Sequence, residues 1–497
     1  MASTRKRKDG ISVAVIGAGF GGMGMGIALK RAGIQDFHIF EAAGEVGGTW
    51  RDNTYPGVAC DIPSHLYSFS FDQNPQWSRR FSPGAEIQEY LVDCARRHGL
   101  YEHITFHTAI QSATFDEVSH RWTLTTDAGI EYQADSLVMA VGPLSTPQIP
   151  DLPGLDEFQG ACFHSSRWDH SLELADKRVG VVGTGASAIQ IVPGIANEAA
   201  EVVVFQRTPP WVIRRRDRAY SSLEKALFTH VPGLQRAYRS FIYLRNEAHA
   251  VGLLDAPFAM RAMERLALKR LRRTIEDRET QAALTPDYSV GCKRVTLSDD
   301  YYPTLARDDV HLIPEAVASF SQEGVVTTGG REVPLDVVVL ATGFKATEYL
   351  SHFSIRGRGG VDLNESWRDG AEAYYGVAVS GFPNLFLLLG PNTGLGHNSV
   401  VFMIEAQINL ALQCIQEMNR RRATAIEVRP STQRRFNDAL QERLRGTVWS
   451  SGCQSWYLDK SGKNTTLWPG YTAEYWLRTR RLNREDFLLH WSRDGAP

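Results

Sequence analysis

The stretches VAVIGAGFGG (residues 13–22) and VGVVGTGASA (residues 179–188) decide the fold. Each places apolar, strand-forming residues ahead of a glycine-rich turn and small, helix-compatible residues behind it. A second apolar segment then ends in a charged residue, IFE at Glu41 and VFQR at Arg207, in both cases 24 positions after the first glycine. A strand, a turn, a helix and a second strand fill that length in a dinucleotide-binding βαβ unit. The chain is therefore predicted to hold two dinucleotides.

The two charged residues predict different dinucleotides. In such a unit the residue that ends the second strand meets the adenosine ribose, where an acid accepts hydrogen bonds from free hydroxyls and an arginine suits a 2′-phosphate. Glu41 therefore indicates FAD, whereas Arg207, with the hydroxyl of Thr208 beside it, indicates NADPH. A surface ion pair is the alternative interpretation of Arg207. Two redox cofactors in one chain are most simply explained by electron transfer between them.

The residues around the two turns make up the predicted dinucleotide sites. Their glycines permit the tight turn and let backbone N–H groups approach a pyrophosphate at the helix N-terminus. The FAD set comprises Gly17, Gly19, Phe20, Gly21 and Gly22, and the NADPH set comprises Gly183, Thr184, Gly185, Ala186, Ser187, Ala188 and Gln190.

The composition is that of a soluble globular protein with two or three domains. The chain has 497 residues and a net charge of −2, which favours neither nucleic acid nor an acidic membrane surface as a partner. We find no secretory signal and no apolar run of the roughly 18 residues that a membrane helix needs. The six cysteines form no C-x-x-C motif, so we expect reduced thiols, a cytoplasmic location and no metal site.

The predicted fold class is α/β, with two dinucleotide-binding, Rossmann-like domains, the NADPH domain inserted in the FAD domain, and a helical insertion. The run LDVVVLATGF is uniformly apolar, as strands buried on both faces of a parallel sheet must be. The arginines of the helical insertion are expected to form a solvated face. The predicted boundaries are residues 1–144 and 352–497 for the FAD domain, 151–215 and 290–351 for the NADPH domain, and 216–289 for the insertion.

Two longer motifs surround the glycine turns. FQGACFHSSRWD fits F-x-G-x3-H-x3-W-D through Phe158, Gly160, His164, Trp168 and Asp169. GGTWRDNTYPGVACD fits G-G-x-W-x4-Y-P-G-x3-D through Gly47, Gly48, Trp50, Tyr55, Pro56, Gly57 and Asp61. With these motifs the chain resembles the type I Baeyer–Villiger monooxygenases, which are class B flavoprotein monooxygenases. The resemblance extends from about residue 11 to the C-terminal GCQSWYLDKSGKNTTLWPG.

The resemblance implies an enzyme in which NADPH reduces FAD, and the reduced flavin reacts with O2 to give a C4a-peroxyflavin. The peroxide then attacks a ketone, which yields an ester or lactone and water. The catalytic residues implied are Arg294, a fixed cation beside the flavin, and Asp61, which tunes that arginine. Lys293 is expected to reach the NADPH 2′-phosphate. Without the resemblance, Lys293 and Arg294 would be interpreted as a surface pair.

The resemblance also implies the remaining cofactor contacts. The further FAD positions are Thr49, Trp50, Asp52, Asp61, Tyr67, Ile110, Asn392 and Val400, and the further NADPH positions are Ala59, Cys60 and Arg294. Asn392 lies in a segment expected to bring backbone donors to the isoalloxazine ring. Trp456 and Tyr457 are expected to border the substrate pocket, and His164 to have a conformational role rather than an acid–base one. Core packing is the alternative for Tyr67, Trp456 and Tyr457.

Two other functions stay open at this point. One is a flavin monooxygenase that acts mainly on sulfur or nitrogen atoms, and the other is a non-catalytic NADPH redox sensor. The expected partners are a small-molecule ketone or sulfide and O2, with no nucleic acid and no membrane. The sequence leaves the ketone class and the oligomeric state open.

Overall fold

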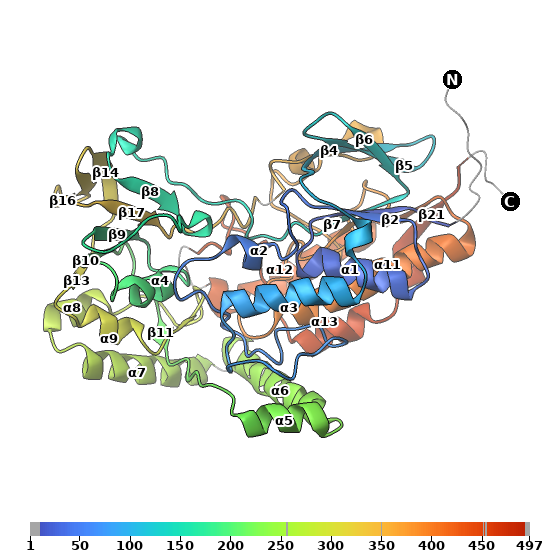
Figure 1. The fold of residues 1–497 in the computed structure, drawn as a ribbon. Coiled ribbons are helices and arrows are strands. Elements are labelled where there is room, and N and C mark those ends of the chain that lie inside the picture. Colours follow the sequence, from blue (N-terminus) through green and yellow to red (C-terminus); the bar gives the residue numbers. More distant parts are fainter. Residues whose placement is uncertain (1–9, 255–256, 349, 451, 453–454, 493–497) are drawn as a thin grey trace.

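The computed structural model describes residues 10–492, except 255–256, 349, 451 and 453–454 (Figure 1). Two five-stranded parallel sheets organise it, one built from both ends of the chain and one from its middle. Figure 1 shows the second sheet to the left of the first. The fold class predicted from the sequence is confirmed, whereas the domain boundaries stay a prediction.

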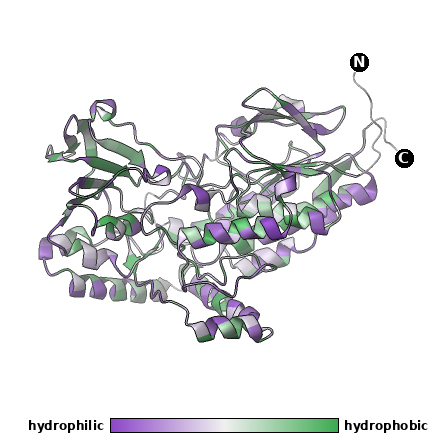
Figure 2. Ribbon diagram, viewed as in Figure 1, coloured by the Kyte–Doolittle hydropathy of each residue, from purple (hydrophilic) through white to green (hydrophobic). Residues whose placement is uncertain are grey.

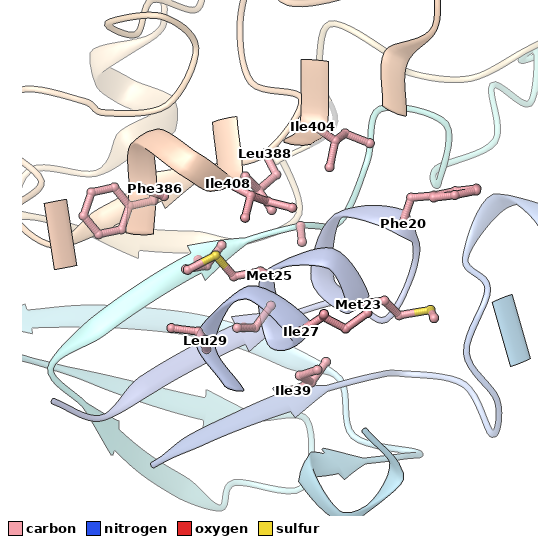
Figure 3. Packing of buried hydrophobic residues seen from close by; sticks show 14 of the residues in the cluster. Phe20, Met23, Met25, Ile27, Leu29, Ile39, Phe386, Leu388, Ile404 and Ile408 are labelled. Carbon is pink, nitrogen blue, oxygen red and sulfur yellow. The ribbon is translucent and has the colours of Figure 1, made fainter. Parts of the chain in front are cut away.

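The first sheet follows directly from the first glycine motif. All of its strands are parallel, and α1 (Phe20–Arg31) connects β1 (Val13–Ile16) to β2 (Phe37–Phe40). The order across the sheet is β19 (Leu385–Leu387), β7 (Ser136–Met139), β1 (Val13–Ile16), β2 (Phe37–Phe40) and β3 (Ile104–Thr105). The long helix α11 (Val400–Arg421) packs against α1, and Figure 3 shows Met25 and Ile408 among the apolar side chains around these two helices.

The second sheet repeats this arrangement. Its order is β13 (Val310–Ile313), β10 (Glu201–Phe205), β9 (Arg178–Val182), β17 (Val337–Leu340) and β8 (Ala161–His164). Helix α4 (Ala188–Ile195) connects β9 to β10, and α9 (Tyr301–Leu305) precedes β13. Figure 2 shows hydrophobic residues, in green, along the strands at the left of the view, as expected for strands buried on both faces.

Smaller elements surround the two sheets. An antiparallel layer contains β4 (Ile110–Asp116), β5 (Arg121–Thr126) and β6 (Glu131–Ala134), with β18 (Ser354–Arg356) parallel to β4. The other strands are β11 (Val212–Ile213), β12 (Thr296–Leu297), β14 (Val317–Ser321), β15 (Gly324–Thr327), β16 (Glu332–Pro334), β20 (Ala425–Val428) and β21 (Phe487–His490). The other α-helices outside the insertion are α2 (Thr49–Asp52), α3 (Gly84–Arg97), α10 (Leu363–Ser366), α12 (Pro430–Arg445) and α13 (Thr472–Thr479).

Two arginines of the helical insertion, the buried Arg239 and the half-buried Arg270, donate hydrogen bonds to the rest of the molecule. It consists of α5 (Ser222–His230), α6 (Leu234–Leu254), α7 (Pro257–Thr274) and α8 (Arg278–Ala283). Arg239 is buried and donates to the carbonyl oxygens of His65 at 2.7 Å and Leu66 at 3.2 Å. Arg270 donates to Ser298 O at 2.7 Å. The prediction of a solvated face is therefore wrong for these two residues, because their long side chains reach carbonyls of distant segments.

The cysteines differ from expectation at one position. Cys292 is disulfide-bonded, whereas Cys60, Cys94, Cys162 and Cys414 are free. Cys453 lies outside the described residues. The prediction that the cysteines are reduced is wrong for Cys292, because pairing depends on the distance between two sulfurs in the fold and not on spacing along the chain. The expectation of a reducing compartment, which was drawn from reduced thiols, is therefore not supported by Cys292. Among the described helices, none is both long and apolar enough for a membrane span.

Gly160 offers a test of how the sheet containing β8 is packed. A Cβ atom at this position would lie 2.4 Å from Phe158 Cζ and 2.5 Å from the carbonyl oxygen of Asp336. We expect Gly160→Ala to lower the free energy of unfolding by about 1–3 kcal/mol, the usual cost of overpacking. Denaturant titration measures the change. The control is Gly446→Ala, at φ −84° and with its nearest contact at 3.9 Å, which should lose no stability. A Gly160→Ala protein as stable as the wild type would contradict this account of the packing.

Candidate active site

A cavity of about 1390 Å³ lies where the two glycine turns meet. Its wall includes the turn after β1 and the turn after β9, at the carboxyl ends of their strands. Ligands of open parallel sheets bind at these ends. One cavity therefore joins both predicted dinucleotide sites.

The first turn is shaped for a closely approaching ligand. Gly17 and Gly22 are required by the protein itself, since an added Cβ would lie 2.8 Å from Ala140 O and 1.8 Å from Gly17 O, respectively. At Gly19 the nearest atom would be 3.7 Å away, so the protein's own packing does not require a glycine there. Gly19 is also the N-cap of α1 and has no side-chain cap. The absence of a steric requirement for glycine at this position and the uncapped helix N-terminus together fit a phosphate group.

Glu41 lies in the cavity wall at the end of β2 and is only 5% exposed. Its carboxylate accepts hydrogen bonds from Ala18 N at 2.8 Å, Ala43 N at 3.0 Å and Arg51 Nη1 at 2.8 Å. These donors orient both oxygens, and a carboxylate has about four acceptor positions in all. Acceptor capacity therefore remains for ribose hydroxyls.

The second turn has the same design. A Cβ at Gly183 would lie 2.6 Å from Ala341 O, whereas one at Gly185 would meet nothing within 4 Å. The Thr184 hydroxyl donates to Thr208 O at 2.8 Å, which holds the turn against the end of β10. The protein's own packing therefore does not require a glycine at position 185, and a ligand can approach the backbone there.

Two cations stand beside this second turn. Arg207 and Lys293 both line the cavity, and the pKa of Lys293 is lowered by burial and then by the charge of Arg207. Lys293 Nζ lies 4.7 Å from the centre of the Tyr288 ring. The ion pairs described nearby join Arg214 to Asp299 and Arg294 to Asp61 instead. In the described part of the chain neither Arg207 nor Lys293 forms an ion pair within 4 Å, although the more distant charge of Asp287 also acts on Lys293. Two adjacent positive charges of this kind favour an anionic ligand.

Arg294 and Asp61 form an ion pair in the same cavity. Arg294 donates to Asp61 Oδ2 from Nε at 3.0 Å and from Nη2 at 2.5 Å, and its Nη1 lies 3.5 Å from Leu395 O. The charge of Asp61 raises the pKa of Arg294, so the guanidinium stays charged throughout the working pH range. The two residues predicted as catalytic are therefore brought together.

The loop that carries Asp61 is hydrogen-bonded to residues that follow strands of the second sheet. Gln190 on α4 donates from Nε2 to Ala59 O at 3.0 Å, and its Oε1 accepts from Ala59 N at 3.3 Å and Tyr55 OH at 3.1 Å. Arg215 donates to Cys60 O at 2.8 Å. Gln190 was predicted to bind NADPH, but its amide is engaged by this loop. Sequence reasoning missed the clamp and Arg215, because nothing in the run RRR distinguishes one arginine.

Most of the other predicted residues line the cavity. Trp50 Nε1 donates to Tyr67 OH at 3.3 Å, which fixes two of the aromatic side chains in the wall. Burial raises the pKa of Tyr457 to about 12. The further lining residues are Phe20, Gly21, Thr49, Asp52, Ala59, Cys60, Ile110, Ala186, Ser187, Thr208, Val400 and Trp456. The predicted residues that do not line the cavity are Gly22, Ala188, Asn392, Tyr457, Phe158, Gly160, His164, Trp168 and Asp169.

Asn392 departs from the expected role. Its backbone N–H donates to Thr465 O at 2.8 Å, and its side chain donates to Asn464 O at 2.8 Å. The N–H of Gly394 is likewise bonded to Thr466 O at 2.8 Å. The expectation of free backbone donors here is wrong for Asn392 and Gly394, because the segment pairs with a distant C-terminal stretch.

His164 ends β8 and contacts a residue of the cavity wall. Its Nδ1 accepts from Ser166 N at 3.1 Å, so the hydrogen resides on Nε2 and is donated to Gly343 O at 2.9 Å. Burial lowers the pKa of His164, so the ring is neutral. This geometry supports a structural or conformational role.

A group of potential metal ligands lies outside the cavity. Asp72, Cys94 and His98 place one ligand atom each within 4.8 Å of one another. Asp72 Oδ2 is already bonded to Arg97 Nη2 and His98 Nε2, both at 3.0 Å. The competing arginine makes this group a hydrogen-bonded network around Asp72.

Comparison with known proteins places these features in a family. The family model described as pyridine nucleotide-disulphide oxidoreductase matches residues 14–227. A Baeyer–Villiger monooxygenase of Pseudomonas aeruginosa is 45% identical over 479 residues, which is 96% of this chain and 91% of the relative. One from Streptomyces coelicolor is 44% identical over 491 residues, or 98% and 94%.

The fold agrees with that assignment. A solved structure of OTEMO in complex with FAD and NADP superposes with a TM-score of 0.87 at 28% identity, covering 96% of this chain and 99% of that one. On the identity and coverage of its relatives, this chain belongs to the Baeyer–Villiger monooxygenase family.

Proposed function

We propose that this chain is an NADPH- and O2-dependent flavin monooxygenase that converts ketones to esters or lactones. The observation that carries the proposal is the Arg294–Asp61 ion pair inside a cavity that both dinucleotide turns share. A charged group held at that junction can act on a substrate next to a redox cofactor.

The residues present fit both cofactors. Gly19, which the protein's own packing does not require, the uncapped start of α1 and the oriented carboxylate of Glu41 suit the pyrophosphate and ribose of FAD. The open space at Gly185 and the cations Arg207 and Lys293 suit NADPH and its 2′-phosphate. Bound flavin, once reduced by NADPH, supplies the activated oxygen for the reaction.

Arg294 supplies the charge that ketone oxidation needs. Addition to a carbonyl carbon places negative charge on the carbonyl oxygen, and a fixed guanidinium beside it stabilises that charge without reorganisation. Asp61 orients the guanidinium through two hydrogen bonds to one oxygen. Trp50, Tyr67 and Leu395 line the cavity and help to exclude water, which would divert the reaction to hydrogen peroxide.

The proposed reaction is tested with a panel of ketones and sulfides. We expect the purified protein with FAD, NADPH and O2 to produce esters or lactones, identified by mass. NADPH consumption alone is not used, because release of hydrogen peroxide also consumes it. Products only from sulfides or amines would replace this proposal with heteroatom oxidation, and no oxygenated product from the panel would refute it.

Replacement of Arg207 tests the NADPH site. We expect Arg207→Ala to reduce the preference for NADPH over NADH by roughly 10- to 100-fold, since a charged hydrogen bond of about 1.5–3 kcal/mol is lost. Steady-state kinetics with both cofactors measure this. Arg214→Ala is the matched control, because Arg214 is two-thirds exposed and pairs with Asp299. Unchanged discrimination in Arg207→Ala would refute the assignment.

Replacement of Arg294 separates flavin reduction from oxygenation. We expect Arg294→Ala to accept electrons from NADPH but to lose about 10²- to 10³-fold in ester formation, the usual effect of removing such a stabilising donor. Anaerobic stopped-flow absorbance follows the reduction, and mass spectrometry follows the ester. An ester yield equal to that of the wild type would contradict the role given to Arg294.

A further inference from the structure

A buried carboxylate of the helical insertion accepts hydrogen bonds from two other segments, the residues before α11 and the start of α13. Glu247 lies on α6 and is 9% exposed. Its Oε1 accepts from the Thr472 hydroxyl at 2.6 Å and from Asn398 Nδ2 at 2.7 Å, and His397 Nε2 lies 3.4 Å away. The backbone N–H groups of Thr472 at 3.3 Å and Ala473 at 3.4 Å also donate to the Glu247 carboxylate, so Glu247 caps the N-terminus of α13.

The contacts around Glu247 are too numerous for an incidental surface charge. Burial alone would raise the pKa of Glu247, but its contacts with His397, Thr472 and Asn398 outweigh burial and lower the pKa to about 2. Tyr243, one turn earlier on α6, has its hydroxyl 3.0 Å from Thr472 Oγ1, and it donates to that oxygen because the Thr472 hydrogen is used by Glu247. Its ring packs 4.9 Å from that of Phe402 on α11. The insertion is therefore seated on the start of α11 and α13 together.

One of these partners belongs to the wall of the active-site cavity. Asn398 lines the cavity, and with Nδ2 bound to Glu247 its Oδ1 accepts from Ser399 N at 2.9 Å. Ser399 is the N-cap of α11, whose first residue Val400 also lines the cavity. Three residues before Asn398, Leu395 O faces Arg294 Nη1 at 3.5 Å. Residues 395–400 thus connect Glu247 to the Arg294 guanidinium.

We propose that Glu247 is a positioning residue, whose carboxylate fixes residues 395–400 and through them the cavity wall beside Arg294. It touches none of the reacting groups itself. An amide at this position carries no negative charge, so an oxygen in the Oε1 position would accept more weakly from Asn398 and Thr472, and its NH2 group would face the N–H of Ala473. Residues 395–400 would then shift, which loosens the wall but leaves the NADPH site at Gly185, Arg207 and Lys293 unchanged.

The inference rests on the proposed oxygenation, and it predicts a specific split between two activities. In Glu247→Gln we expect flavin reduction by NADPH within about twofold of the wild type, and ester formation reduced roughly five- to tenfold, as for the loss of one hydrogen bond. Hydrogen peroxide released per NADPH should rise accordingly. Glu247→Asp retains the carboxylate and should recover part of the ester yield.

The matched control is Glu224→Gln, on α5 of the same insertion. Glu224 pairs with Arg218, and its side chain is 31% exposed, so its loss should leave ester and peroxide yields as in the wild type. Equal ester and peroxide yields in Glu247→Gln and the wild type would overturn the inference. A parallel loss of stability, flavin reduction and ester formation, with no recovery in Glu247→Asp, would also overturn it, because it indicates a purely structural role.

Hydrogen–deuterium exchange gives a readout that does not depend on catalysis. We expect faster exchange in residues 395–400 and 472–474 of the Glu247→Gln holoenzyme, and wild-type exchange around Gly185. Unchanged exchange in residues 395–400 would refute the positioning role, even in a protein that oxygenates ketones. If the wild type forms no ester, the proposed function fails, and the exchange result still decides the role of Glu247.

Discussion

The ion pair between Arg294 and Asp61 links the two dinucleotide-binding halves of the molecule. Asp61 follows a loop of the first half, and Arg294 comes from the chain that returns after the helical insertion. Both must be in place before a fixed positive charge can stand in the shared cavity. The Gln190 clamp, the Arg215 contact to Cys60 O and the Leu395 carbonyl all act on this pair or its supporting loops. Much of the surrounding structure can be understood as support for one guanidinium.

The two glycine turns differ in which glycines the fold requires. Gly17, Gly22 and Gly183 are enforced by close backbone contacts, whereas a Cβ at Gly19 would make only an ordinary contact at 3.7 Å and one at Gly185 would meet nothing within 4 Å. The first group is explained by folding alone. The second is explained by something that approaches the backbone closely, which is why these two positions argue for ligands more strongly than the motif as a whole. Glu41 and Arg207 then distinguish the two proposed ligands.

Local patterns predicted what depends on local structure. The strand–turn–helix units and the place of Glu41 at the end of the second strand were predicted from motifs. The proximity of Arg294 to Asp61, which are 233 positions apart, was implied by the family resemblance and not by any local pattern. The contacts of Asn392, Arg239 and Gln190 were not predicted, because each is determined by a partner far along the chain: Thr465, His65 and Ala59, respectively. The disulfide bond of Cys292 was not predicted either. Glu247 gave no signal at all, since a single glutamate in a charged helix is indistinguishable from a solvated one. Residues of this kind become visible only when the fold brings their partners together.

The clamp between α4 and the loop of Tyr55 and Ala59 has a consequence for motion. Gln190 makes three hydrogen bonds across the junction, and a Cβ at Gly194 would lie 2.6 Å from Pro56 O, so the two halves are in tight contact there. A rotation of one half against the other must break the clamp and the Arg294–Asp61 pair in the same step. Any relative motion of the two halves at this junction therefore costs the three hydrogen bonds of Gln190 and the Arg294–Asp61 ion pair together, at about 0.5–1.5 kcal/mol for each neutral hydrogen bond.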